Sequence, residues 1–123
     1  YEEVYDYRNI EVTIDEQGVF KVTMNESLAV ALLTNLLKNA FVHNIDGGHI
    51  RITITKNSIT FRNSGVEHPL DKKHIFERFY QGSKKEGSTG LGLAIADSIC
   101  RLQHLNIKYY FEQNEHCFEI SQS

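Results

Sequence analysis

Alternation of apolar and polar residues marks several short stretches of this chain as strands that bury one face. Six stretches share this alternation or a β-rich composition: residues 9–14, 19–24, 49–56, 58–62, 106–112 and 116–121. The third and fourth stretches are separated only by Asn57, which predicts a hairpin. The pattern therefore predicts a sheet with one covered face, built largely from strands that are neighbours in the sequence.

Helical spacing of apolar residues marks two longer stretches. Residues 26–43 place leucines and alanines in one broad stripe, and Asn25 stands where an N-cap is expected. Residues 89–104 carry a second stripe, and a short helix is expected over residues 71–80. The order of these elements predicts an α+β fold, a two-layer α/β sandwich with a mixed, largely antiparallel sheet and the helices packed on one face.

The bulk composition is that of an ordinary globular domain. The chain has 123 residues, of which 41% are hydrophobic and 24% are charged. Its net charge of −3 argues against sequence-independent binding of nucleic acid, which requires a surplus of basic residues. The two cysteines, Cys100 and Cys117, are expected to be buried reduced thiols rather than a disulfide.

A glycine-rich segment, residues 87–92, runs directly into the second long helix. Glycine lets the backbone approach a ligand closely, because it has no Cβ. The start of a helix also presents unpaired N–H groups and the positive end of the helix dipole. Such a site binds anions, most often a phosphate group, whereas the alternative interpretation is a plain glycine-rich turn.

Two asparagines, Asn35 and Asn39, lie four residues apart and so share one face of the first long helix. Mg²⁺ prefers oxygen ligands and takes few of them from protein when phosphates are present. An asparagine carbonyl facing a triphosphate suits that role. The alternative is a pair of asparagines that are bonded only to the local backbone.

Four blocks of sequence recur in the order and spacing of one family. They are residues 35–40 (NLLKNA), 63–65 (NSG), 75–80 (IFERFY) and 87–93 (GSTGLGL). Together they resemble the catalytic ATP-binding domain of bacterial sensor histidine kinases, in the superfamily shared by gyrase, HSP90 and MutL. The resemblance extends over about residues 10–120 and implies the Bergerat-type ATP-binding fold.

The resemblance implies that ATP and Mg²⁺ bind here, with Asn39 as the metal ligand and Asn35 beside the phosphates. Gyrase-type relatives have a glutamate at the position of Asn35, and an amide cannot act as a general base. That difference suits a domain that transfers phosphate to a histidine rather than to water, and no catalytic residue is assigned within this chain. Residues 66–88 are expected to be a lid that closes over ATP. The other residues expected at the ATP site are His43, Asn63, Gly65, Arg78, Phe79, Gly87, Thr89, Gly90, Leu91 and Gly92.

The chain departs from the family pattern at four positions. Val42 replaces a lysine that reaches the phosphates, and His43 stands where an aromatic residue is common. Asn63 replaces the aspartate that bonds the adenine amino group, and Glu67 replaces the second glycine of that block. Asn63 keeps a carbonyl oxygen that can accept a hydrogen bond from adenine.

The function implied by the resemblance is to bind Mg-ATP and donate its γ-phosphoryl group to a histidine on a preceding dimerisation domain. A response regulator is then the expected partner, as in two-component signal transduction, and nucleic acid is not. No histidine here has the phosphoacceptor context, so residues 1–8 are expected to be a linker from a missing domain and residues 9–123 the catalytic domain. The parent protein is expected to be a homodimer anchored in the inner membrane, with this domain in the cytoplasm. Two alternatives are a degenerate, nucleotide-poor interaction module and a serine-kinase anti-sigma factor of the same superfamily.

Overall fold

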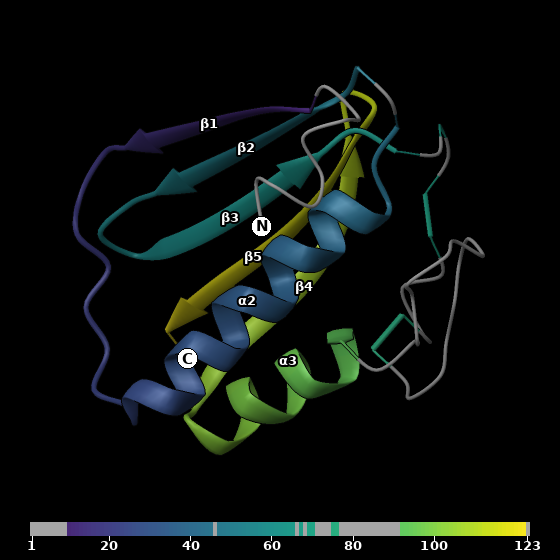
Figure 1. The fold of residues 1–123 in the computed structure, drawn as a ribbon. Coiled ribbons are helices and arrows are strands. Elements are labelled where there is room, and N and C mark those ends of the chain that lie inside the picture. Colours follow the sequence, from purple (N-terminus) through teal and green to yellow (C-terminus); the bar gives the residue numbers. More distant parts are fainter. Residues whose placement is uncertain are drawn as a thin grey trace.

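The computed structural model describes residues 10–45, 47–65, 67, 69–70, 75–76 and 92–122. The elements in chain order are β1 (Glu11–Glu16), α2 (Glu26–Val42), β2 (His49–Ile54), β3 (Ser58–Asn63), α3 (Gly92–Leu102), β4 (Leu105–Glu112) and β5 (Glu115–Gln122). The described strands form one sheet in the order β1-β2-β3-β5-β4, with α2 and α3 on one face (Figure 1). β1 is parallel to β2 and the other pairs are antiparallel, which confirms the predicted mixed sandwich.

The core lies between the helices and the face of the sheet that they cover. Ile52, Phe61 and Phe118 occupy one row across β2, β3 and β5, and they pack against leucines of α2 and the apolar side of α3. Residues two positions further along each strand face the same side, because side chains alternate along a strand. Asn63 and His116 therefore lie on the helix-covered face as well, at the edge of this core.

Helix α2 begins as the sequence predicts. The Asn25 side chain accepts hydrogen bonds from the backbone N–H groups of Ser27 at 2.8 Å and of Leu28 at 3.3 Å. These bonds satisfy donors that have no partner within the helix, so the N-cap assignment is confirmed. Helix α3 ends at Leu102, and His104 has a left-handed φ of 60° that cannot continue the helix.

The predicted strand at residues 19–24 is wrong. Because β1 pairs with β2 in parallel, the chain must cross from the end of β1 to the start of α2 before it returns, and residues 18–25 make that crossing (Figure 1). Their alternation comes from Phe20 and Met24, which pack against the core, while Val19 is 66% exposed. The segment is attached to the sheet by the Gln122 side chain, which donates to the Lys21 carbonyl at 2.7 Å.

The predicted half-burial of the first strand is also wrong, because every residue of β1 is exposed. Ile14, which shares a face with the core residue Ile52 of β2, is 59% exposed since the helices do not extend over β1. The short helix predicted at 71–80 lies outside the described residues except for Ile75 and Phe76, and so does the segment 81–91. Within the described part of the chain, no helix is long and apolar enough to cross a membrane.

Candidate functional site

The last residue of β3, Asn63, has a buried acceptor without a partner. The side chain is 2% exposed, and its Nδ2 donates to the Ser64 carbonyl at 2.8 Å. Its Oδ1 has no hydrogen-bond partner among the described residues. Leaving a buried polar atom unpaired costs about 1–3 kcal/mol. Asn63 is therefore suited to accept a hydrogen bond from a molecule that enters this end of the sheet.

Gly65 lies where the backbone must pass between two neighbours. A Cβ at this position would be 2.9 Å from the His43 carbonyl oxygen and 3.1 Å from Cδ2 of His116. Both contacts are tighter than ordinary packing allows, so a side chain here would push the loop away from α2. The glycine keeps the chain after Asn63 close to the C-terminal end of that helix.

Helix α2 brings the two predicted asparagines to the same region. The Asn35 side chain donates from Nδ2 to the Ala31 carbonyl at 2.7 Å, and its Oδ1 would be 3.3 Å from a Cβ on Gly92. Asn35 thus adjoins the start of α3, the end of the glycine-rich block. Asn39 lies one turn further along the same face of α2 and is partly buried.

Helix α2 ends beside the same loop. His43 is the C-cap residue, and its backbone N–H donates to the Asn39 carbonyl at 3.1 Å. Its own carbonyl oxygen faces Gly65, so His43 lies at the border of the site. Val42 is buried, and its side chain therefore supplies neither charge nor exposed surface in place of the family lysine.

The structure thus places predicted site residues in two groups along α2: Asn35 with Gly92, and His43 with Asn63 and Gly65, while Asn39 lies on α2 between them. The remaining predicted site residues lie outside the described residues: Arg78, Phe79, Gly87, Thr89, Gly90 and Leu91. Of the aromatic block, Ile75 is buried and Phe76 packs edge-on against Phe118, with ring centroids 6.2 Å apart.

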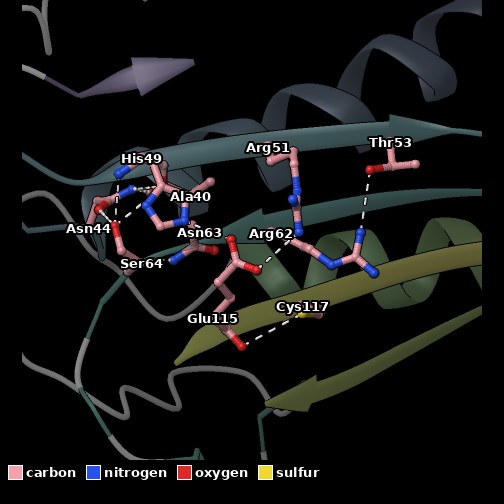
Figure 2. A network of polar contacts seen from close by, with 10 residues as sticks. All are labelled: Ala40, Asn44, His49, Arg51, Thr53, Arg62, Asn63, Ser64, Glu115 and Cys117. Carbon is pink, nitrogen blue, oxygen red and sulfur yellow. Dashed lines mark hydrogen bonds and ion pairs between the residues drawn. The ribbon is translucent and has the colours of Figure 1, made fainter. Parts of the chain in front are cut away.

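A buried polar network behind Asn63 was not predicted from the sequence (Figure 2). Asn44 donates from Nδ2 to the carbonyls of Ala40 at 3.1 Å and His49 at 3.0 Å, while its Oδ1 accepts from the Ser64 hydroxyl at 2.5 Å. Any side chain at Gly48 would collide with both Asn44 and Ser64. The network fixes the end of α2 to the ends of β2 and β3, which are the elements that carry Asn39 and Asn63.

A second network lies on the opposite face of the sheet. The Glu115 carboxylate pairs with Nε2 of His49 at 2.6 Å and with the Arg51 guanidinium at 3.2 Å (Figure 2). These contacts tie β5 to β2 across the end of β3. No group of three or more histidine, cysteine, aspartate or glutamate side chains suited to a metal ion occurs within the described ranges.

The β4–β5 hairpin contributes two further buried polar residues near the site. The Tyr109 hydroxyl lies 2.7 Å from Nδ1 of His116 and accepts a hydrogen bond from the Leu70 backbone N–H at 3.0 Å. His116 also stacks on Tyr109 and contacts Phe111, with ring centroids 5.9 and 4.8 Å apart. The sequence offers no signal for this pair, because its geometry depends on the register of β4 against β5.

Comparison with known proteins identifies the class. Residues 24–121 match the family described as histidine kinase-, DNA gyrase B-, and HSP90-like ATPase. Sensor histidine kinase RppB of Synechocystis is 43% identical over 84 residues, which cover 61% of this chain and 18% of that protein. Heme sensor protein HssS of Staphylococcus saprophyticus is 36% identical over 96 residues, 73% of this chain and 21% of that protein. The chain thus spans only a small part of the length of these relatives.

Solved structures agree with this assignment. The catalytic domain of histidine kinase ThkA has a TM-score of 0.81 and 25% identity, covering 97% of this chain and 82% of that one. The same kinase in complex with the response regulator TrrA has a TM-score of 0.75 and 25% identity, covering 99% of this chain and 37% of that one. The chain therefore belongs to the histidine kinase-, DNA gyrase B-, and HSP90-like ATPase family, as the ATP-binding catalytic domain of a histidine protein kinase.

Proposed function

We propose that this domain binds Mg-ATP between the end of β3, helix α2 and the start of α3. It then donates the γ-phosphoryl group to a histidine of a preceding dimerisation domain. The observation that carries the proposal is the buried Oδ1 of Asn63, which has no partner in the described part of the chain. An acceptor in this state matches a base that presents an amino donor, as adenine does.

At the base end, the described residues fit adenine in two respects. The Asn63 amide is held by the bond from one N–H of Nδ2 to the Ser64 carbonyl, and this orientation leaves Oδ1 as the acceptor. Gly65 removes the Cβ that would otherwise push the loop out of place. A buried acceptor of this kind discriminates strongly, since a base without the matching donor leaves it unpaired.

At the phosphate end, Asn39 is the proposed metal ligand and Asn35 lies beside the start of α3. An asparagine carbonyl is a hard oxygen ligand of the kind Mg²⁺ accepts in addition to phosphates and water. The metal ion, when bound, neutralises charge that develops on the phosphates during transfer. Asn35 cannot remove a proton from water, which favours transfer to a protein acceptor over hydrolysis.

The proposed transfer forms a bond between an imidazole nitrogen and the γ-phosphorus as the bond to the β,γ-bridging oxygen breaks. ADP leaves with that oxygen, and the imidazole loses its proton. The acceptor histidine belongs to the proposed preceding domain, joined through residues 1–8, and residues 9–123 form the catalytic unit. The structural relative that was solved with a response regulator supports a regulator as the final recipient here too. One relative is a heme sensor protein, and the parent of this domain is proposed to be a sensor kinase anchored in a membrane.

Asn39→Ala tests the metal-site assignment. Alanine favours a helix more than asparagine does, so the fold should persist, while the only proposed protein ligand of Mg²⁺ is lost. The expected result is that adding Mg²⁺ no longer raises ATP affinity, measured by calorimetry with and without the ion. Asn57→Ala, an exposed asparagine in the β2–β3 turn, is the matched control and should behave as the wild type.

The same titration separates the alternatives. A wild-type chain that binds no ATP would support the interaction module and contradict the proposal. Unchanged Mg-ATP affinity in Asn39→Ala would remove Asn39 as the ligand while leaving nucleotide binding intact. Phosphate from ATP that appears on a serine of a partner, rather than on a histidine of the longer protein, would identify the anti-sigma alternative.

A further inference from the structure

One pair of side chains in the β4–β5 hairpin holds both ends of the loop that leaves β3. Tyr109 is 5% exposed and His116 is 3% exposed. A tyrosine hydroxyl has one proton and two lone pairs, so Tyr109 can accept from the Leu70 N–H while it donates to Nδ1 of His116. The hydroxyl therefore fixes the chain at residue 70.

The imidazole of His116 lies beside the chain just after β3, at Gly65. His116 is the direct partner of Asn63 in the β3–β5 register, and both side chains lie on the helix-covered face. Its Cδ2 is also one of the atoms that leave no room for a side chain at Gly65. Residues 63, 65 and 70 are thus positioned by one connected unit.

Aromatic packing fixes the orientation of that unit. Tyr109 packs on Phe118 with ring centroids 5.0 Å apart, and its ring is nearly parallel to that of His116, at 21°. Gln113 and Asn114 form the tight turn between the two strands, with left-handed φ values of 53° and 59°. This short connection sets the register that places Tyr109 and His116 beside each other.

We propose that Tyr109 and His116 are positioning residues for the base end of the nucleotide site. They hold Asn63, Gly65 and Leu70 at the depth where the Asn63 Oδ1 meets the base, and they act through Asn63 and Gly65. This role rests on the proposed ATP-binding function. Part of the base selectivity of the site would then come from residues outside the four sequence blocks.

Tyr109→Phe is the direct test, because it removes only the hydroxyl. Loss of the two hydrogen bonds should weaken ATP affinity by roughly 3- to 10-fold, the range expected for one or two net hydrogen bonds. GTP affinity should change less, since the guanine base has no amino group in the matching position, so the ATP-to-GTP affinity ratio falls. General destabilisation would lower both affinities together. Hydrogen exchange at the Leu70 amide should also become faster.

Tyr110→Phe is the matched control. Tyr110 is the next residue on β4, faces the other side of the sheet, and donates its hydroxyl proton to Glu119 at 3.1 Å. The Tyr110→Phe variant loses a hydrogen bond of the same kind, but one that is distant from Asn63. Its ATP-to-GTP affinity ratio should therefore equal that of the wild type. His116→Leu should lower the ratio as Tyr109→Phe does, and the double variant should lose little more, because the two residues act as one unit.

Three results would overturn the role of the pair. They are an unchanged ATP-to-GTP ratio in Tyr109→Phe, an equal fall in Tyr110→Phe, and fully additive losses in the double variant. If Tyr109→Phe does not fold, His116→Gln is compared with His116→Leu. Glutamine keeps an acceptor for the tyrosine hydroxyl, so its ATP-to-GTP affinity ratio should be close to that of the wild type. ATP binding by the wild-type chain is measured first. If the wild type binds no ATP, both the proposed function and this positioning role are contradicted.

Discussion

At the scale of single residues, the orientation of one amide would determine which base the proposed site selects. The sequence leaves Asn63 free to present either its oxygen or its nitrogen. In the structure Nδ2 donates to the Ser64 carbonyl, while Oδ1 is buried and has no partner among the described residues. Reversing the amide would place Oδ1 against another oxygen, which makes the accepting orientation the stable one.

Asn63→Ala and Asn63→Asp test this selection in opposite directions. Alanine removes the acceptor, and ATP affinity should fall by about 1–3 kcal/mol while GTP affinity changes less. An ionised aspartate can only accept, so the preference for ATP over GTP should exceed that of the wild type, although its second oxygen loses the bond to Ser64. Competition binding with both nucleotides measures these ratios, and a wild-type preference as large as that of the aspartate variant would contradict the assignment.

The sequence predicts residues for the proposed site but not the residues that support them. Asn39, Asn63 and Gly65 stand out because amides and glycines at fixed spacing have few purely local explanations. Asn44 and His116 give no such signal, since each acts through partners that only the folded register supplies. An asparagine just after a helix, followed by a glycine pair, is the one hint that the sequence offered for Asn44.

At the scale of elements, α2 is the frame of the site, and its first turn depends on one cap. Asn25→Ala removes the acceptor for the N–H groups of Ser27 and Leu28. The free energy of unfolding should fall by about 1 kcal/mol, the usual effect of losing an N-cap, as measured by urea denaturation. Asn106→Ala, at an exposed position of β4, should leave it unchanged, and equal stability of both variants would contradict the capping role.

Residues 19–24 show why local pattern alone misassigned one element. Alternation reports which side chains are buried, and it is satisfied equally by a strand and by an extended crossing that packs Phe20 and Met24 on the core. Residues 19–24 form the crossing and not a strand because β1 pairs with β2 in parallel, and parallel strands require a crossover connection. The antiparallel pairs β2–β3 and β4–β5 need no such connection; the sequence predicted the first as a hairpin and the second only as two consecutive strands.

At the scale of the whole molecule, two buried thiols link stability to pH. Burial is the main cause that raises the pKa of Cys100 and of Cys117 from 9.0 to about 11, and the Asp97 carboxylate adds to it at Cys100. Unfolded thiols ionise near pH 9 while the folded ones remain protonated, so the unfolded state gains stability as pH rises. The contribution is complete below pH 9 and is lost between about pH 9 and 11.

Thermal unfolding between pH 7 and 11 should therefore show a fall in midpoint that begins near pH 9. The Cys100→Ala/Cys117→Ala double variant should fall less steeply over that interval, although it is less stable at neutral pH because of the lost packing. Burial also raises the pKa of Tyr110 from 10.0 to about 12, and that contribution starts one pH unit higher. A wild-type midpoint that stays level up to pH 11 would show that the thiols are not buried.

The exposed edge strand determines which part of the molecule opens first. β1 contributes no buried residue and has β2 as its one neighbour in the sheet, whereas β3 and β5 each pair on both sides. Releasing β1 breaks a single ladder and leaves the core between the helices and the other strands intact. Its opening free energy is therefore well below that of global unfolding. Residues 11–16 can thus detach and reattach without disturbing Asn63, Gly65 or α2, so the proposed upstream domain would be able to shift while the proposed nucleotide site keeps its shape.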